Sequence, residues 1–314
     1  MVTETEKETL VIINPNAGRR RGEKDWDEIS ALLKKAGFNY KAVFTQYPRH
    51  AIGISASHIK KGYKNLIVVG GDGTMNEVIN GIFSQNRYPT TEISLGMITV
   101  GTGNDWARMF NIPGGYAEAI SVIKRNNGFV QDAGVVKYYQ GIEQKCRYFV
   151  NIAGIGFDAL VVSKTNKMKE NGKGGAWTYL KSIIISLMKY RHTRTKIRID
   201  NHEISNDVFN ISIGICKYNG GGMMQLPHAV ANDGFFDVTV INKIKKHEVI
   251  LNLKRLYNGT ITKHHTVESY KGKSIFIDSE PIIHLETDGE SLGHSPFIFE
   301  IIPRSIKILT TETV

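Results

Sequence analysis

Strands and helices alternate along the first 126 residues, and this pattern restricts the fold more than any other feature of the sequence. Apolar runs rich in β-branched residues predict buried strands at 9–14, 40–44, 66–69 and 93–100. Apolar residues at helical spacing predict helices at 23–36, 49–61 and 75–83, and again after Asp105 and near Gly115. Such alternation is typical of a parallel, doubly wound sheet, whose ligands bind beyond the carboxyl ends of the strands.

The pattern changes at about Val130, where short strands separated by Gly, Asn and Asp turns begin. This spacing is typical of an antiparallel sandwich or barrel, and one helical insertion at about 174–191 interrupts it. We therefore predict an α/β + all-β chain with its active site in the cleft between the two lobes. The expected domains are an α/β lobe over 1–134 and a β-sandwich lobe over 135–302, with 303–314 as a segment that could rejoin the first.

Composition and charge narrow the class of protein. Hydrophobic residues make up 41% and charged residues 22% of the 314 residues, as in a globular protein with a substantial core. A formal net charge of +10 suits an anionic partner, such as nucleic acid, an anionic membrane or a phosphorylated substrate. No nucleic-acid-binding module is recognisable, so nucleic acid is not expected. The polar start MVTETEKE and the two separated cysteines, Cys146 and Cys216, predict a cytoplasmic protein.

A glycine-rich turn, VVGGDGTMNEVI (68–79), joins the third strand to the third helix. Thr74 is a natural N-cap, and Glu77 three residues later completes a capping-box pattern. Glycines at a helix N-terminus let a phosphate approach converging backbone N–H groups. A tight turn without ligand is the alternative, but it does not need an acid among the glycines. Because Asp72 would repel a phosphate, a cation or a transferable proton is expected between them.

The other strand ends carry similar residues. Asn14–Gly18 (NPNAG) follows the first strand, Thr45 ends the second, and Gly101–Asp105 (GTGND) follows the fourth. Four consecutive strand ends therefore carry glycines or small polar residues, and two of them carry an aspartate. Since these ends lie side by side in a parallel sheet, the sequence predicts an anion-binding edge.

The motifs NPNAG, GGDGTMNEV and GTGNDWAR, in this order and spacing, resemble the diacylglycerol kinase catalytic-domain family. The closest group is the bacterial soluble lipid kinases, which are related to sphingosine and ceramide kinases. The resemblance covers nearly the whole chain and continues through Asn151–Ala159, Gly220–Met223, Asn232–Asp237 and Asp288–Glu290.

This resemblance implies an enzyme that transfers the γ-phosphate of ATP to a lipid hydroxyl with the help of Mg²⁺. The expected acceptor is diacylglycerol, which would become phosphatidic acid. The residues that would contact ATP are Asn14, Pro15, Asn16, Ala17, Gly18, Thr45, Gly71, Asp72, Gly73, Thr74, Asn76, Glu77, Gly101, Thr102, Asn104 and Asp105.

The resemblance also implies roles for individual acids. Asp72 and Asp105 would be linked to Mg²⁺ at the phosphates, and Asp132 would join that acidic network unless it only caps a turn. Glu290 is the candidate general base, although Asp-Gly-Glu alone is more often a hairpin turn. Asp288 is the alternative base, or a metal-linked neighbour.

A second, structural Mg²⁺ site is implied at Asp233, with the main-chain oxygens of Val230 and Phe235 sharing the coordination. Two observations weaken it. Asn-Asp-Gly favours a hairpin turn, and Asn232 stands where the family often carries an acid.

Two other functions stay open at this stage: an NAD kinase, which shares the GGDGT motif, and a non-catalytic lipid-binding relative. The presence of Asp72, Asp105 and Glu290 argues against a dead site. A lipid substrate and the positive charge together predict transient contact with the inner face of an anionic membrane. The sequence leaves a homodimer open.

Overall fold

The computed structural model describes residues 8–170 and 176–311, except for the side chains of 169–182, and divides them into two compact units. Unit 1 comprises residues up to 133 together with those from 302 onward, and unit 2 comprises 134–301. Two strands cross the boundaries, β5 (Gly128–Gln140) and β16 (Glu290–Leu309). The described residues include no helix long and apolar enough to cross a membrane.

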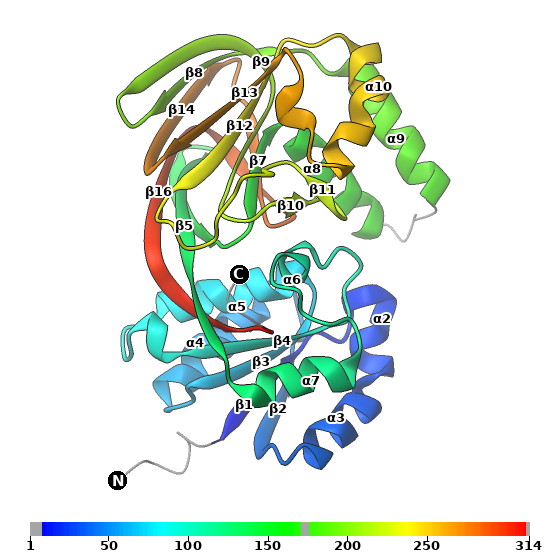
Figure 1. Cartoon of the computed structure of the whole chain (residues 1–314), viewed down its shortest axis with the longest axis vertical. Coiled ribbons are helices and arrows are strands. Elements are labelled where there is room, and N and C mark those ends of the chain that lie inside the picture. Colours follow the sequence, from blue (N-terminus) through cyan, green and yellow to red (C-terminus); the bar gives the residue numbers. More distant parts are fainter. Residues whose placement is uncertain (1–7, 171–175, 312–314) are drawn as a thin grey trace. The chain divides into compact units, whose positions relative to one another are not determined.

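Unit 1 is built on a parallel sheet with the strand order β2-β1-β3-β4, which the C-terminal end of β16 extends beside β4 (Figure 1). This confirms the predicted parallel, doubly wound sheet. The order reverses between β1 and β3, so β1 and β3 flank the switch point at which such sheets bind ligands. The strands are β1 (Thr9–Ile13), β2 (Tyr40–Phe44), β3 (Asn65–Gly70) and β4 (Ser94–Thr99).

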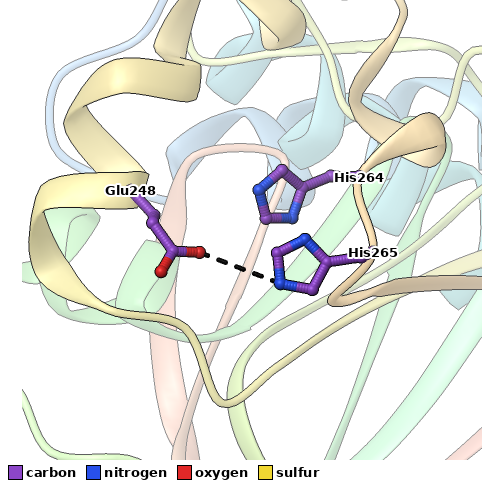
Figure 2. A group of neighbouring side chains, drawn as sticks. All are labelled: Glu248, His264 and His265. Carbon is purple, nitrogen blue, oxygen red and sulfur yellow. Dashed lines mark ion pairs between the residues drawn. The ribbon is translucent and has the colours of Figure 1, made fainter.

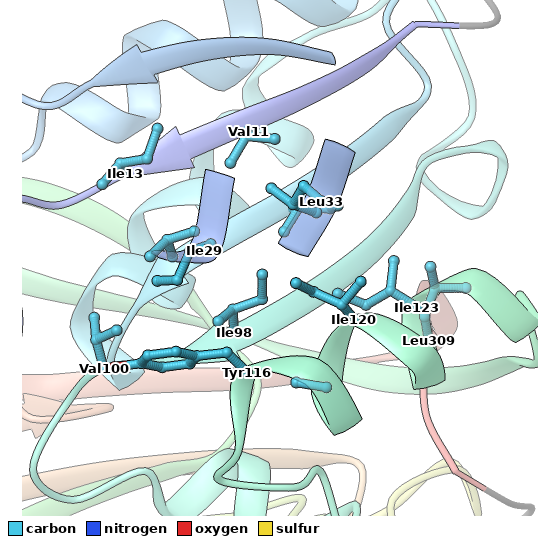
Figure 3. Close-up of a cluster of buried hydrophobic side chains, with 13 residues drawn as sticks. Val11, Ile13, Ile29, Leu33, Ile98, Val100, Tyr116, Ile120, Ile123 and Leu309 are labelled. Carbon is cyan, nitrogen blue, oxygen red and sulfur yellow. The ribbon is translucent and has the colours of Figure 1, made fainter. Parts of the chain in front are cut away.

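Helices cover both faces of this sheet. On one face α3 and α7 bury Ile29, Leu33, Ile120 and Ile123 against Val11 and other strand residues (Figure 3). On the other face α4 and α5 pack against each other, against β1 and against β3. The helices are α2 (Ala17–Lys24), α3 (Trp26–Lys35), α4 (His50–Lys60), α5 (Asp72–Ser84), α6 (Asp105–Met109) and α7 (Tyr116–Arg125), with a 3-10 turn η1 (Thr90–Glu92).

Unit 2 is rich in antiparallel strands, as predicted for the C-terminal lobe. Its strand pairs are antiparallel, and Phe149, Phe236 and Phe299 pack their rings together in its core. The strands are β6 (Glu143–Phe149), β7 (Ile152–Gly156), β8 (Thr193–Ile199), β9 (His202–Gly214), β10 (Tyr218–Asn219), β11 (Met223–Met224), β12 (Phe236–Asn242), β13 (Val267–Gly272), β14 (Ser274–Glu280) and β15 (His284–Thr287).

The helical insertion predicted at about 174–191 is confirmed by α9, but the expectation that it is a single insertion is wrong. The described residues form α8 (Phe157–Glu170), α9 (Ala176–Lys189), α10 (Lys246–Tyr257) and a 3-10 turn η2 (Ile261–Lys263). The apolar residues of α8 are spread around the helix, so periodicity, the main signal for a helix in a sequence, is weak there. The apolar residues of α10 recur at helical spacing, but α10 buries no residue fully.

Candidate functional site

The loops after β1, β3 and β4 interlock at the carboxyl edge of the unit 1 sheet. The backbone N–H of Asn14 donates to the Val69 carbonyl at 3.0 Å, and that of Val100 donates to the Gly70 carbonyl at 2.9 Å. Gly18, at φ +60°, lies so close to the Val100 carbonyl that an added Cβ would be 1.7 Å from its oxygen. Only glycine fits there, since a side chain would separate the first loop from the third.

The turn after β3 differs in detail from the capping box read from the sequence. Gly71 is the N-cap of α5, and Thr74 lies inside the first turn, so its prediction as N-cap is wrong. The Thr74 hydroxyl accepts a hydrogen bond from the side-chain amide of Asn14 at 2.9 Å, and this bond connects the loop after β1 to α5. Both carboxylate oxygens of Glu77 accept backbone N–H groups at the start of α4, from Arg49 at 2.8 Å and Ala51 at 3.1 Å. Glu77 thus caps a neighbouring helix instead of its own.

Asp72 lies at the start of α5 and faces the start of α6. Its carboxylate accepts the backbone N–H groups of Asp105 at 3.2 Å and Trp106 at 3.1 Å. Burial raises the pKa of Asp72, and the negative charge of Asp105 raises it further. Two carboxylates held this close repel each other, so the pair favours a cation or a shared proton between them.

Two carboxylates flank the turn before α6, and the side-chain oxygen of Asn104, within this turn, lies beside Gly101 and Gly71. A Cβ added to Gly103 would lie 3.2 Å from Asp72 Oδ2 and 3.5 Å from Asp105 Oδ2, so glycine leaves the space beside both carboxylates open. Asn104 sits in the left-handed region at φ 52°, and its buried Oδ1 has no hydrogen-bond partner among the described residues. Oxygen-only donor sets of this kind fit Mg²⁺. We call Asp72, Asn104 and Asp105 the acidic corner.

The remaining predicted ATP contacts are distributed around this edge. Thr45 is buried, and its backbone N–H donates to the Ile13 carbonyl at 2.8 Å. Thr102 is exposed in the loop between β4 and α6, and buried Asn76 accepts the Asn80 amide at 3.2 Å. The others lie on the turn after β1 (Pro15, Asn16), at the start of α2 (Ala17), within α5 (Gly73) and after β4 (Gly101).

Asp132 lies fully buried in β5. Its Oδ1 accepts the backbone N–H of Arg304 at 2.7 Å, and Arg304 occupies the left-handed region at φ 44°. Asp132 therefore fastens the C-terminal part of β16 to unit 1, and its membership of a metal-linked network stays a prediction.

In unit 2, Asp288 and Gly289 form the two-residue turn that joins β15 to β16, with φ of 48° and 83°. Positive φ at both positions is the signature of a tight hairpin turn. The Asp288 carboxylate accepts the backbone N–H groups of Val150, Asn151 and Ile152, each at 3.1 Å. Because these donors occupy it, Asp288 is better suited to hold the hairpin than to accept a proton, which leaves Glu290 as the candidate base.

Glu286, which no sequence pattern marks as a site residue, is a fully buried carboxyl two residues before that turn. Its Oε2 accepts the backbone N–H of Gly289 at 2.9 Å, and its Oε1 accepts the Asn219 amide at 3.0 Å. Burial raises the pKa of Glu286 to about 8, and the nearby Asp158 adds to the rise. Gly154 makes room for this pair, since a Cβ there would lie 2.6 Å from Glu286 Oε1. Glu286 follows Leu285 in a strand of only four residues, so no alternation in the sequence indicates that its side chain is buried.

Replacing Glu286 by Gln is expected to stabilise the protein progressively as the pH rises from 5 to 8. A carboxyl with a pKa of 4.5 when unfolded and about 8 when folded stays protonated in the native state while the unfolded chain ionises. Wild-type stability therefore falls by about 1.4 kcal/mol per pH unit in that window, and Gln removes this loss. Urea unfolding at pH 5, 6, 7 and 8 measures it. The exposed control Glu300→Gln should show no trend, and an equal trend there would refute the assignment.

At the second predicted metal site, around Asp233, a lysine side chain supplies the positive charge. The Lys271 ammonium lies 2.8 Å from Asp233 Oδ2 and 3.4 Å from Asp237 Oδ2, and Asp233 Oδ1 accepts the Phe235 N–H at 3.1 Å. Val230, three residues before Asp233 in the sequence, is exposed. Since Lys271 already balances Asp233, these contacts give no reason to place Mg²⁺ there.

Comparisons with protein families cover both units. The model of the diacylglycerol kinase catalytic domain matches residues 8–136. The model of the YegS C-terminal NAD kinase beta sandwich-like domain matches residues 151–310.

Individual relatives match along almost the full length. A diacylglycerol kinase of Staphylococcus carnosus (strain TM300) is 28% identical over 308 residues, which cover 98% of this chain and 96% of the relative. One of Staphylococcus saprophyticus is 29% identical over 308 residues, covering 98% and 97%.

Solved structures share the fold. That of a diacylglycerol kinase from Bacillus anthracis str. Sterne has a TM-score of 0.71 at 23% identity and covers 98% of both chains. Yeast NADH kinase complexed with NADH has a TM-score of 0.54 at 12% identity and covers 97% of this chain and 84% of its own. The fold of this chain is thus less similar to NADH kinase than to the diacylglycerol kinase structure.

Proposed function

Since the chain belongs to the diacylglycerol kinase catalytic-domain family and is an ATP-dependent lipid kinase, we propose that its acceptor is the free hydroxyl of diacylglycerol. The product is phosphatidic acid. The acceptor rests on the relatives named diacylglycerol kinase. The observation that carries the phosphoryl transfer is the acidic corner, because Asp72 and Asp105 flank an open space next to three interlocked strand-end loops. Such an edge suits a polyphosphate that arrives with a cation.

The phosphates of ATP would contact the glycine turns after β1, β3 and β4, which Gly18 and Gly71 allow to pack together, Gly18 against the Val100 carbonyl and Gly71 against Gly101. Asp72, Asp105 and Asn104 would hold Mg²⁺, which supplies positive charge against the phosphates during transfer. The acceptor oxygen would bond to the γ-phosphorus as the bond from phosphorus to ADP breaks. Its proton would pass to Glu290, at the start of β16.

A transfer assay tests this function. Labelled ATP and Mg²⁺ are supplied with diacylglycerol, ceramide, sphingosine or NAD in separate reactions. We expect label in phosphatidic acid at a rate at least tenfold above the other acceptors. Label in NADP would refute the acceptor class, and label in a sphingolipid would refute diacylglycerol as the preferred acceptor.

We also propose that α10 contacts the anionic membrane surface that holds the substrate. Ile250, Leu253 and Tyr257 recur along one face of α10 and are 49%, 44% and 57% exposed. Helical spacing puts them in one row, and we call them the α10 stripe. An outward apolar row reverses the usual arrangement of a surface helix and marks an interaction surface.

A basic hollow lies beside the stripe and identifies the kind of partner. This hollow is open to solvent, has a volume of about 520 Å³ and is lined by Lys254, Arg255 and Lys263 together with Asn258 and Thr260. None of its described lining residues is acidic. Three cations there suit the phosphates of anionic lipids. A second copy of the chain is a poorer partner, because a symmetric contact would bring these cations together.

Vesicle binding is expected to weaken about fivefold for Lys254→Gln and for Lys263→Gln, as each lysine contributes about 1 kcal/mol near an anionic surface. Binding should also fall as salt rises, because salt screens these charges. Co-sedimentation with phosphatidylglycerol/phosphatidylcholine vesicles, without ATP, measures both effects. The matched control is Lys34→Gln on the exposed face of α3. An equal loss in the control, or salt-independent binding, would argue against the α10 surface.

A further inference from the structure

One carboxylate and two imidazoles gather in unit 2, on residues that the proposed kinase mechanism does not use. Glu248 lies in the first turn of α10, and His264 and His265 directly follow η2 (Figure 2). One potential ligand atom of each residue lies within 4.8 Å of the other two. Two segments separated in sequence therefore meet at a group of donors that could share one ion.

His264 is held in a fixed orientation. It is buried, and its backbone N–H donates to the Ile261 carbonyl at 3.0 Å. Its Nδ1 lies 2.9 Å from the Thr266 hydroxyl oxygen and accepts the Thr266 backbone N–H at 3.4 Å. Contacts of this kind fix the orientation of a ring before a metal arrives.

His265 and Glu248 can adjust around this fixed ring. His265 Nε2 lies 4.0 Å from Glu248 Oε2, and the two side chains are 77% and 23% exposed. The rings of His264 and His265 are 4.5 Å apart between centroids. Ligand atoms of a tetrahedral Zn²⁺ lie about 3.4 Å apart, given bonds of about 2.0–2.2 Å. Side-chain rotations that close the group by about 1–1.5 Å would satisfy this geometry.

We propose that Glu248, His264 and His265 bind a divalent transition-metal ion, with Zn²⁺ as the preferred ligand. Two imidazole nitrogens and one carboxylate oxygen suit Zn²⁺ or Co²⁺, whereas Mg²⁺ and Ca²⁺ prefer oxygen-only shells. This site is therefore chemically distinct from the acidic corner of unit 1. Three protein ligands leave a coordination position for water.

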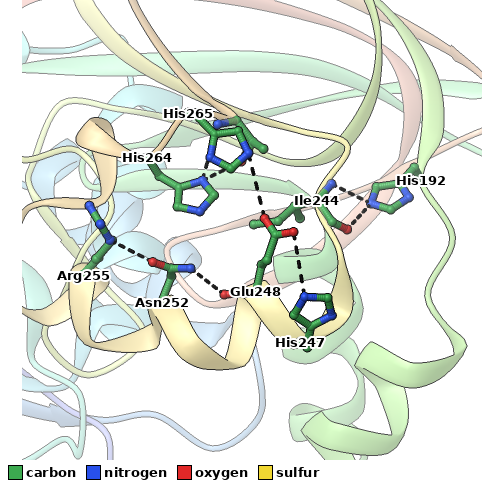
Figure 4. Close-up of polar contacts among 9 residues, drawn as sticks. His192, Ile244, His247, Glu248, Asn252, Arg255, His264 and His265 are labelled. Atoms are coloured by element: carbon green, nitrogen blue, oxygen red, sulfur yellow. Dashed lines mark hydrogen bonds and ion pairs between the residues drawn. The ribbon is translucent and has the colours of Figure 1, made fainter.

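Neighbouring charges limit the affinity of this site. Arg255 lies near His264 and donates its Nε–H to Asn252 Oδ1 at 2.8 Å (Figure 4). The positive charge of Arg255 opposes a cation bound at His264. Burial lowers the pKa of His264, and the charges of His265 and Arg255 lower it further. These effects favour the neutral imidazole, which is the form that binds a metal. We expect binding in the micromolar range, since only one carboxylate attracts the metal.

Titration of the chelator-treated full-length chain tests the proposal, with Zn²⁺ followed by calorimetry and Co²⁺ by its visible absorption. We expect one ion per chain and visible bands typical of low-coordinate Co²⁺. His265→Ala and Glu248→Gln should each weaken binding at least tenfold. Zn²⁺ should raise the Tm of the wild type but not of these variants, because a ligand of the native state stabilises it. Millimolar Mg²⁺ should not compete.

His247→Ala is the matched control. His247 Nε2 lies 4.0 Å from the other oxygen of Glu248, outside the proposed ligand set, so affinity should change less than twofold (Figure 4). Unchanged binding by His265→Ala, an equal loss in His247→Ala, or displacement by Mg²⁺ would overturn the proposal. These measurements use neither ATP nor lipid, so their outcome is independent of the proposed acceptor.

Discussion

Asp72→Asn is expected to lower kcat for phosphatidic acid formation by about 10³-fold and to leave the fold intact. The substitution removes one of the two negative charges that face the open space beside Gly103. Asn keeps an oxygen that can accept one of the N–H bonds from Asp105 or Trp106, so α6 retains part of its anchor. Loss of charge, rather than loss of structure, should therefore dominate.

Steady-state kinetics at several Mg²⁺ concentrations, with thermal unfolding of the same preparation, measure this effect. Asp27→Asn, on the exposed face of α3, is the matched control and should retain wild-type activity. A variant with near-normal kcat would refute a role for Asp72 at the phosphates. A collapse of Tm would show instead that Asp72 serves mainly to hold α6.

Glu290→Gln is expected to lower kcat by about 10²–10⁴-fold and to leave the KM for ATP within about twofold. Glutamine keeps the size of the side chain at the start of β16 but cannot take a proton from the acceptor hydroxyl. The neighbouring Asp288→Asn should behave differently. It weakens the three N–H bonds from Val150, Asn151 and Ile152, so it should lower Tm more than Glu290→Gln does.

The pH dependence of kcat separates the two acids. A general base produces a rising acid limb in the wild type that Glu290→Gln abolishes. If Asp288→Asn removes that limb and Glu290→Gln keeps it, the roles of the two residues are exchanged.

The sequence predicted the parts of unit 1 that depend on local pattern. Apolar strands followed by amphipathic helices identified the parallel sheet, and parallel strands necessarily bring their carboxyl ends together. That reasoning placed Asp72 near Asp105, as the structure does. It could not assign the partners of Thr74 and Glu77, because a capping box and a bond to a distant element need the same residue types.

Unit 2 was harder to predict because its important contacts join residues far apart in the chain. The burial of Glu286 depends on Asn219 and Asp158, which lie on other elements. The exposed apolar row of α10 resembles a core-facing helix in sequence, and only the fold reveals that it faces outward. Asp288 lies in the sequence like a candidate base, but its three backbone donors depend on the pairing of β7 with β15, which no local pattern encodes.

The hydrogen bond from the Trp106 backbone N–H to Asp72 connects the acidic corner to a fluorescent side chain. The Trp106 indole is buried, donates its Nε1–H to Gln131 at 3.1 Å, and packs beside the Phe110 ring. Any rearrangement of the Asp72 carboxylate acts on the backbone of this chromophore, whose emission depends on polarity and hydrogen bonding. We therefore expect that ATP bound at the proposed site would change the intrinsic fluorescence of Trp106.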